Sequence, residues 1–183
     1  MILLAVAGLM FRWEPGNQRL KADGTTSARI TPDTVINQPE LDIFDENGRK
    51  IRQLQGVQLQ HFATDNHSVI SEAYAQFQKK TPDLTGDNFW QLKGNQAVVS
   101  NNNSVIELQG NVLLWKNDAE AGKTEFRTEQ ILVNMSSEIA ETDKPVKIHH
   151  LSSIAEATGM RADLTNEKIT LLSHVKEVHE FRH

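Results

Sequence analysis

The amino-acid sequence predicts an all-β fold made of repeated antiparallel strand pairs. Residues 94–112 align without gaps with residues 128–146, at an offset of 34 positions. Residues 159–175 follow the same pattern when two single-residue gaps are allowed. Apolar side chains alternate with polar ones in each copy, as they do along a strand with one buried face. Repetition at this length is typical of a supersecondary unit that stacks on copies of itself.

Each copy has the pattern of a strand, a turn and a second strand. Turns are expected at residues 101–103 and 135–137, where Asn and Ser favour local backbone bonds over helix. Glu107 follows Val105 by two positions, and the second copy repeats this with Glu141. Strict alternation would place acid and apolar side chains on one face, so a bulge, a corner or an open rim is expected there. The apolar pairs expected to share a face are Ala97 and Val99, Ile131 and Val133, and Ala162 and Leu164.

Shorter strands are expected before the repeats. Residues 41–45 and 50–54 flank Asn47-Gly48, a dipeptide that favours a hairpin turn because both residues tolerate positive φ. Residues 57–61 alternate between apolar and polar, and residues 68–77 are a degenerate earlier copy of the repeat. Loops are expected at residues 79–87 and 117–123.

The chain divides into three segments: an apolar segment (1–13), a polar linker (14–28) and the folded β domain (29–183). The eleven apolar or small residues Met1–Phe11 would span about 17 Å as a helix. A bilayer has a hydrocarbon core about 30 Å thick. Two interpretations stay open, a truncated transmembrane anchor and the buried first element of a soluble domain. The polar linker favours the anchor.

Composition narrows the classes of function. The 183 residues carry a net charge of −5, and no run of Lys or Arg occurs, so nucleic-acid binding has little support. Cysteine is absent, which excludes disulfide bonds and thiol chemistry. Hydrophobic residues make up 38% and aromatic residues 6%. These fractions are low for a closed, dry core, and they leave room for an open interior.

No constellation of residues points to catalysis, a cofactor or a metal ion. The GxSxG, phosphate-loop and HExxH motifs are missing. His149 and His150 are adjacent and would point to opposite faces of a strand, which makes them a poor chelating pair. Glu138 and Glu141 could serve acid–base chemistry at a glycosidic bond. Solvated surface charge is the commoner role in a chain with 24 acids.

Apolar residues at matching positions of the copies form columns along the stack. They allow two interpretations, an ordinary packed core and an apolar groove that binds acyl chains. As a groove, the columns predict these lining residues: Val99, Val105, Val112, Leu114, Ile131, Val133, Ile139, Val146, Ile148, Leu164, Ile169 and Val175.

Three motifs resemble a known protein family. They are ELQGNV at 107–112, FRTEQILVN at 126–134 and ATGMRADL at 157–164. The motifs are similar to the repeated signature of the OstA-like proteins, which carry lipopolysaccharide across the bacterial periplasm. The apolar segment, the linker, the hairpin at 44–48 and the chain length are similar to the inner-membrane LptC branch of this family. The resemblance covers residues 29–181.

The resemblance implies a twisted, open β-jellyroll with an apolar groove. It implies non-enzymatic transport of lipopolysaccharide from the inner membrane towards the outer membrane, without a cofactor. Lipopolysaccharide would come from an inner-membrane ABC transporter complex (LptBFG) and pass to the periplasmic bridge protein LptA. A single-pass anchor would hold the main domain in the periplasm. The contact residues expected are Ile36, Leu41 and Ile43 at the transporter edge, and Leu171, Val175, Val178 and Phe181 at the bridge-protein edge.

Two other functions stay open. A structural β-scaffold would oligomerise through its exposed strand edges. A solenoid enzyme acting on polysaccharide would use acids such as Glu107 and Glu141, which occupy equivalent positions in two copies.

Overall fold

The computed structural model describes residues 31–78, 89–100, 104–118 and 121–179. The expected anchor (1–13) and linker (14–28) lie outside the described residues. Among the described residues, no helix is long and apolar enough to cross a membrane.

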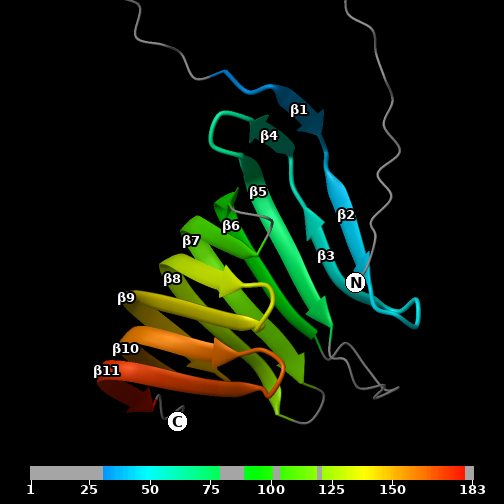
Figure 1. The fold of residues 1–183 in the computed structure, drawn as a ribbon. Helices are drawn as coiled ribbons and strands as arrows, with labels where there is room; N and C mark the ends of the chain where they lie inside the picture. The colour runs from blue at the N-terminus through cyan, green and yellow to red at the C-terminus, as the bar shows by residue number, and fades with distance from the viewer. Residues whose placement is uncertain (1–30, 79–88, 101–103, 119–120, 180–183) are drawn as a thin grey trace, which may run out of the picture.

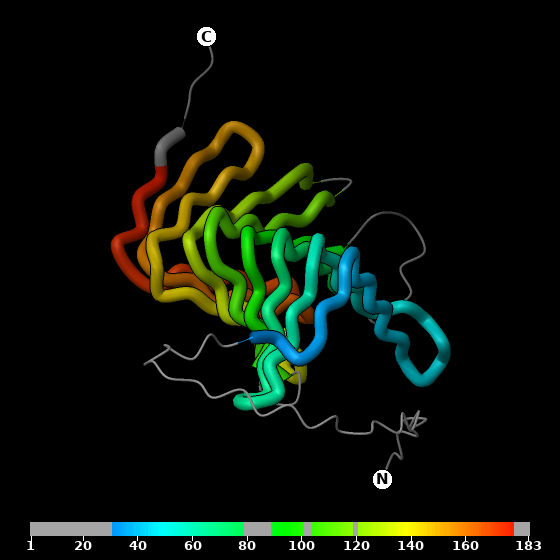
Figure 2. Tube along the Cα trace, turned by 90° about the horizontal axis from the view of Figure 1, so that it is seen from above, coloured from blue at the N-terminus to red at the C-terminus, as the bar shows by residue number. Residues whose placement is uncertain are grey.

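The described chain forms one antiparallel sheet of eleven strands, which does not close on itself (Figure 1). The predicted all-β class and the open arrangement of strand pairs are confirmed. From β5 to β11 the strands follow one another in chain order across the sheet (Figure 2), whereas β1 pairs with β4, and β2 with β3, at the N-terminal end. The strands are β1 (Thr34–Asn37), β2 (Glu40–Phe44), β3 (Lys50–Gln55), β4 (Gln58–Phe62), β5 (His67–Gln78), β6 (Phe89–Ser100), β7 (Val105–Asp118), β8 (Gly122–Asn134), β9 (Ile139–His150), β10 (Ser153–Asp163) and β11 (Lys168–His179).

The first four strands are the halves of two bent strands. β3 and β4 both pair with β5, β3 with its C-terminal half and β4 with its N-terminal half. The corner between them is Gly56–Val57, where the amide of Val57 donates to the carbonyl of Ser71 at 2.9 Å. β1 and β2 are split in the same way around Gln38, whose φ is 51°.

The long strands bend near their midpoints. Positive φ angles occur at Glu72 (49°), Gly110 (73°), Asn111 (50°), Gly159 (81°) and His174 (50°). The strand pairings shift register at the same level. Such bulges add a residue to one strand and kink it. No such irregularity separates Val105 from Glu107, because residues 105–109 pair with β8 without a shift, and both side chains lie on the same face; the bulge in β7 comes later, at Gly110–Asn111.

The common bend divides the sheet into two wings. Wing A comprises the described residues of 34–37, 58–71, 96–109, 130–142 and 160–171. Wing B comprises the described residues of 40–55, 73–94, 112–128, 146–158 and 175–179. We call the surfaces that face each other the inner faces, and the opposite surfaces the outer faces.

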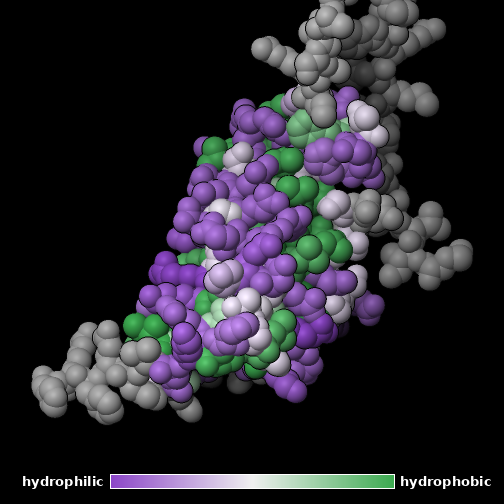
Figure 3. All heavy atoms as spheres, turned by 90° about the vertical axis from the view of Figure 1, so that its left-hand side faces the viewer, coloured by the Kyte–Doolittle hydropathy of each residue, from purple (hydrophilic) through white to green (hydrophobic). Residues whose placement is uncertain are grey.

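The inner faces of both wings pack into a single hydrophobic core. Burying one such side chain stabilises the fold by about 1.5–3 kcal/mol. The outside is different, because the side shown in Figure 3 is mostly hydrophilic, with separate hydrophobic patches. The largest side chains with under 2% exposure are Ile70, Leu92, Leu108, Leu114, Ile131, Met160, Val112, Val133 and Val146.

Candidate functional site

The interior between the two wings is the candidate site, because most of the predicted groove residues lie there. Eight of the twelve have side chains that are 0–9% exposed on the inner faces. Ile169 is half-buried and packs against the same core. The eight buried residues are Val99, Val112, Leu114, Ile131, Val133, Val146, Ile148 and Leu164.

The other three predicted lining residues lie elsewhere. Val105 is on the outer face, because its neighbour Ile106 is 4% exposed in the core. Ile139 is on the outer face for the same reason, next to Ala140 at 0% exposure. Val175 lies on β11, the last strand of the sheet, and is 54% exposed. The structure therefore does not bring Val105, Ile139 and Ile169 together on one face.

Several interior residues were not among those predicted. Ile106 and Leu108 extend the inner face of wing A, and Trp90, Leu92 and Phe126 fill wing B. Ile106 and Leu108 would have been predicted if the alternating inner positions had been counted from Ile106 instead of Val105. The sequence does not decide between the two counts because both positions are apolar.

The interior is filled along the middle of the sheet and open at its N-terminal end. A cavity of about 290 Å³ lies between β2, β3, β5 and β6, next to a second of about 180 Å³. Leu41, Leu54, Leu59 and Ile70 line both cavities. Ile36 and Leu41, expected at the transporter edge, lie here with 47% and 54% exposure. Ile43, the third residue of that set, lines the larger cavity.

The C-terminal end of the sheet is a free strand edge. Within the described residues β11 pairs only with β10. Leu171 packs against the core, and the backbone of Val178 pairs with Ile154. Phe181 lies outside the described residues.

Two ion pairs join the wings along the side where their strand ends meet, which we call the mouth. The guanidinium of Arg52 in β3 lies 2.6 Å from the carboxylate of Glu138, in the turn between β8 and β9. The hydroxyl of Thr165 also donates to Glu138. The ammonium of Lys116 in β7 lies 2.7 Å from the carboxylate of Glu167, in the turn between β10 and β11. Both turns lie on the right-hand side of Figure 1. The mouth is therefore closed in this conformation.

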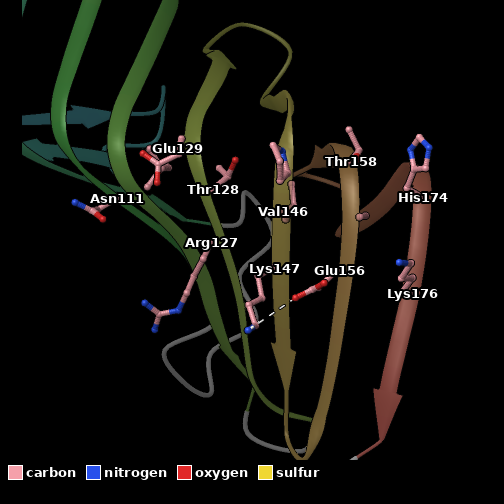
Figure 4. Close-up of a pocket in the computed structure, with 13 residues that line it drawn as sticks. Asn111, Arg127, Thr128, Glu129, Val146, Lys147, Glu156, Thr158, His174 and Lys176 are labelled. Carbon is pink, nitrogen blue, oxygen red and sulfur yellow. Dashed lines mark ion pairs between the residues drawn. The ribbon is translucent and has the colours of Figure 1, made fainter.

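A separate depression of about 560 Å³, lined mostly by polar residues, crosses β7 to β11 where the strands bend (Figure 4). The ladder between β8 and β9 is interrupted there, between the pairs Arg127–Lys147 and Leu132–Glu141. The hydroxyl of Thr128 is buried at this level without a hydrogen-bond partner in the described structure. The depression follows the line along which the sheet bends.

Glu107 and Glu141, the two acids that a polysaccharide-active enzyme would use, lie on the outer face and interact with neighbouring side chains. Glu107 accepts hydrogen bonds from the side-chain amides of Gln109, at 2.7 Å, and Gln130. Glu141 pairs with Arg161. Leu132 lies between the two acids in the sheet. In the described part of the chain, no group of three His, Cys, Asp or Glu residues is placed to hold a metal ion.

Comparisons with known proteins agree with this architecture. The family model described as "Lipopolysaccharide-assembly, LptC-related" matches residues 1–180. A similar solved structure is that of LptH from Pseudomonas aeruginosa, described as the LptA-homologous periplasmic component of the conserved lipopolysaccharide transport device. Its TM-score is 0.52 at 10% sequence identity, over 70% of this chain and 94% of that chain. This likeness shows the fold alone. No curated protein matches the chain.

Proposed function

This chain belongs to the LptC-related family of lipopolysaccharide-assembly proteins, and we propose that it carries lipopolysaccharide with the acyl chains between its two wings. Lipopolysaccharide transport is established at the level of the family. The conduit through this particular fold, its direction and its partners are our proposal.

The observation that carries the proposal is the continuous apolar lining of both inner faces. It runs from the cavity near Leu41 through the core to Leu171 in the last strand. An acyl chain costs about 0.8 kcal/mol for every CH₂ left in water. A lining of this kind offsets that cost along the whole path. The side of the molecule shown in Figure 3 is mostly hydrophilic, as expected for a conduit that stands in water.

Loading requires the wings to separate, because the middle of the interior is already filled. Val133 and Ile131 have no exposed surface. Incoming acyl chains would replace contacts between the wings with contacts of the same chemical kind. The main barrier is then the opening of the mouth, where ion pairs and turns hold the wings together.

The two ends of the sheet suit two partners. The exposed apolar residues Ile36 and Leu41 form the receiving end, towards the inner-membrane transporter complex LptBFG. The free edge of β11 is the delivering end, where the bridge protein LptA would add a strand. Residues 1–13 would anchor the chain in the inner membrane of a Gram-negative cell. No bond is made or broken by this chain, and ATP hydrolysis by the transporter supplies the energy.

Photo-crosslinking in intact cells tests the conduit. Probes at Val133 and Ile148 lie on the inner faces, and probes at Ile139 and Lys147 lie on the outer faces. We expect lipopolysaccharide adducts from the inner pair only, and only while ATP is present. Adducts of equal yield from both pairs, or from neither in a folded protein, would contradict the proposal.

Two further probes test the ends. Leu41 should crosslink to a transporter subunit and Val175 to the bridge protein, whereas the exposed Leu151, in the turn between β9 and β10, should crosslink to neither. The opposite assignment of Leu41 and Val175 would reverse the proposed direction.

A further inference from the structure

A row of four inner-face residues at the rim of wing B has an unusual composition. Arg52, Phe77, Trp90 and Lys116 are cross-strand neighbours on β3, β5, β6 and β7. We call them the rim row. Phe77 and Trp90 are 5% and 6% exposed, and Lys116 is 7% exposed. Lys and Arg are seldom buried unless they are paired, so cations at the edge of an apolar interior require a reason.

The partners of both cations come from the opposite wing. Glu138 pairs with Arg52 at 2.6 Å across 86 positions of sequence, and Glu167 pairs with Lys116 at 2.7 Å. Removing one member of a buried ion pair is strongly destabilising, because it leaves an uncompensated charge. When the wings separate, each cation loses its carboxylate and requires another anion.

The rim row also has hydrogen-bond donors that are not used. Arg52 Nε and Trp90 Nε1 are buried without a partner in the described structure. An indole N–H usually finds a partner when it is buried. Arg, Lys and Trp donate only, so a ligand of this row must be rich in acceptors and negatively charged. A phosphate group meets both conditions and offers more acceptor oxygens than a carboxylate.

The spacing suits a headgroup rather than a single ion. Neighbouring strands are about 4.8 Å apart, so the backbones of Arg52 and Lys116 are separated by roughly 14 Å. Two aromatic residues lie between them, and the Lys116 ammonium is 6.0 Å from the centre of the Trp90 ring. Apolar interior begins directly below the row at Ala75 and Leu92. This order of cation, aromatic surface and apolar lining matches a phosphorylated sugar that carries acyl chains.

We propose that the rim row binds the phosphorylated headgroup of the acylated cargo, and that the carboxylates of Glu138 and Glu167 occupy this headgroup site while the mouth is closed. The inference rests on the proposed function. On opening, phosphate replaces carboxylate at Arg52 and Lys116, so neither cation is left unpaired. An anionic cargo thereby favours the open conformation, and a neutral one does not.

Binding to a matched pair of lipids tests the site. One is a bisphosphorylated, acylated glucosamine disaccharide, and the other is the same lipid without phosphate, both in one mild detergent with the full chain. We expect the wild type to prefer the phosphorylated lipid by about tenfold or more. Arg52→Gln and Lys116→Gln should each lose most of that preference, without weaker binding of the other lipid.

Control variants separate the rim row from general electrostatics. Arg127→Gln and Lys147→Gln remove outer-face cations that are 56% and 50% exposed, and they should keep the preference. Glu167→Gln keeps the cation but removes the competing carboxylate, so it should tighten binding of the phosphorylated lipid. This variant also tests the site if Arg52→Gln does not fold, because Glu167 is 32% exposed.

The outcomes are distinguishable. Equal binding of both lipids by the wild type overturns the headgroup site and leaves the conduit standing. Binding of neither lipid contradicts the conduit and this inference with it. Tight binding of inorganic phosphate alone, without acyl chains, would show a free-anion site and overturn the lipid assignment. Weaker binding by Glu167→Gln would show that the ion pair only holds the wings together.

Discussion

Ile106 and Ile139 lie in the same wing but on opposite faces of the sheet. Ile106 is 4% exposed in the core, whereas Ile139 is half-buried on the outer face. We expect Ile106→Ala to lower the free energy of unfolding by about 2–5 kcal/mol. Ile139→Ala should cost less than half as much. Urea denaturation of the two variants measures both losses, and equal losses would contradict the assignment of faces.

Glu125 on the outer face of β8 makes stability depend on pH. The hydrogen bond from the Lys123 ammonium, with a smaller contribution from Arg127 at 2.8 Å, holds the pKa of the Glu125 carboxyl below its ordinary value of 4.5. A lowered pKa stabilises the fold above the unfolded-state pKa, and this stabilisation is lost as pH falls through the folded-state pKa.

Glu125→Gln should therefore lower stability at pH 7 by less than about 1 kcal/mol, because both cations are largely exposed. At pH 3 the difference from the wild type should shrink. Unfolding curves at both pH values measure this. A deficit that grows towards pH 3 would contradict the cause given for the pKa shift.

The limits of sequence reasoning are clearest at Val105 and Ile106. Both are apolar and adjacent, so alternation alone allows either to face the core. The structure places Ile106 on the inner face with Val112 and Leu114, and Val105 on the outer face with Glu107. The inner positions Val112 and Leu114 could be predicted because they match Val146 and Ile148 of the next copy, where the polar Lys147 separates the two apolar residues.

At the scale of elements, the mid-strand bulges give the sheet its shape. Gly110 has φ of +73°, and a Cβ there would lie 2.9 Å from the side-chain nitrogen of Asn95. Gly48 in the β2–β3 turn has a similar φ of +76°, but a Cβ there would meet nothing within 4 Å. Both glycines have positive φ, but only Gly110 is crowded, so comparing substitutions at the two positions distinguishes the cost of backbone strain from the cost of crowding.

Gly110→Ala should cost about 1–3 kcal/mol of stability, from both strain and crowding. Gly48→Ala should cost less, since it carries the strain alone. Thermal or urea unfolding compares them. A larger loss at Gly48 would show that the bulge at Gly110 is not a constraint on the sheet.

Most strands could be predicted because their repeats are regular. The three copies correspond to β6–β7, β8–β9 and β10–β11, and the Asn47-Gly48 hairpin joins β2 and β3. The breaks in the first strands at Gln38 and Gly56 could not be predicted, because they depend on how the halves pair. β1 pairs with β4, and both β3 and β4 pair with β5. Local sequence does not encode that choice of partner.

At the scale of the whole molecule, the wings form a filled interior with one open end. The contacts that close the mouth join residues as far apart as Arg52 and Glu138, and no local pattern predicts them. The sequence also left open whether the interior is packed or hollow. The structure shows it packed in the middle, so loading depends on separation of the wings.

Locking the mouth tests the central claim, that cargo enters between the wings. The chain has no cysteine, so Arg52→Cys with Glu138→Cys can be joined by a short, reducible thiol crosslinker. A matched control joins Gln96→Cys with Gln109→Cys, which are neighbours within wing A.

The measurement is binding of the acylated disaccharide without phosphate, which does not use the cations of the rim row, by the locked protein before and after reduction. We expect locking across the mouth to weaken binding by at least about tenfold, with recovery on reduction, and the control lock to have no effect. Equal binding by the locked and reduced proteins would contradict a conduit between the wings.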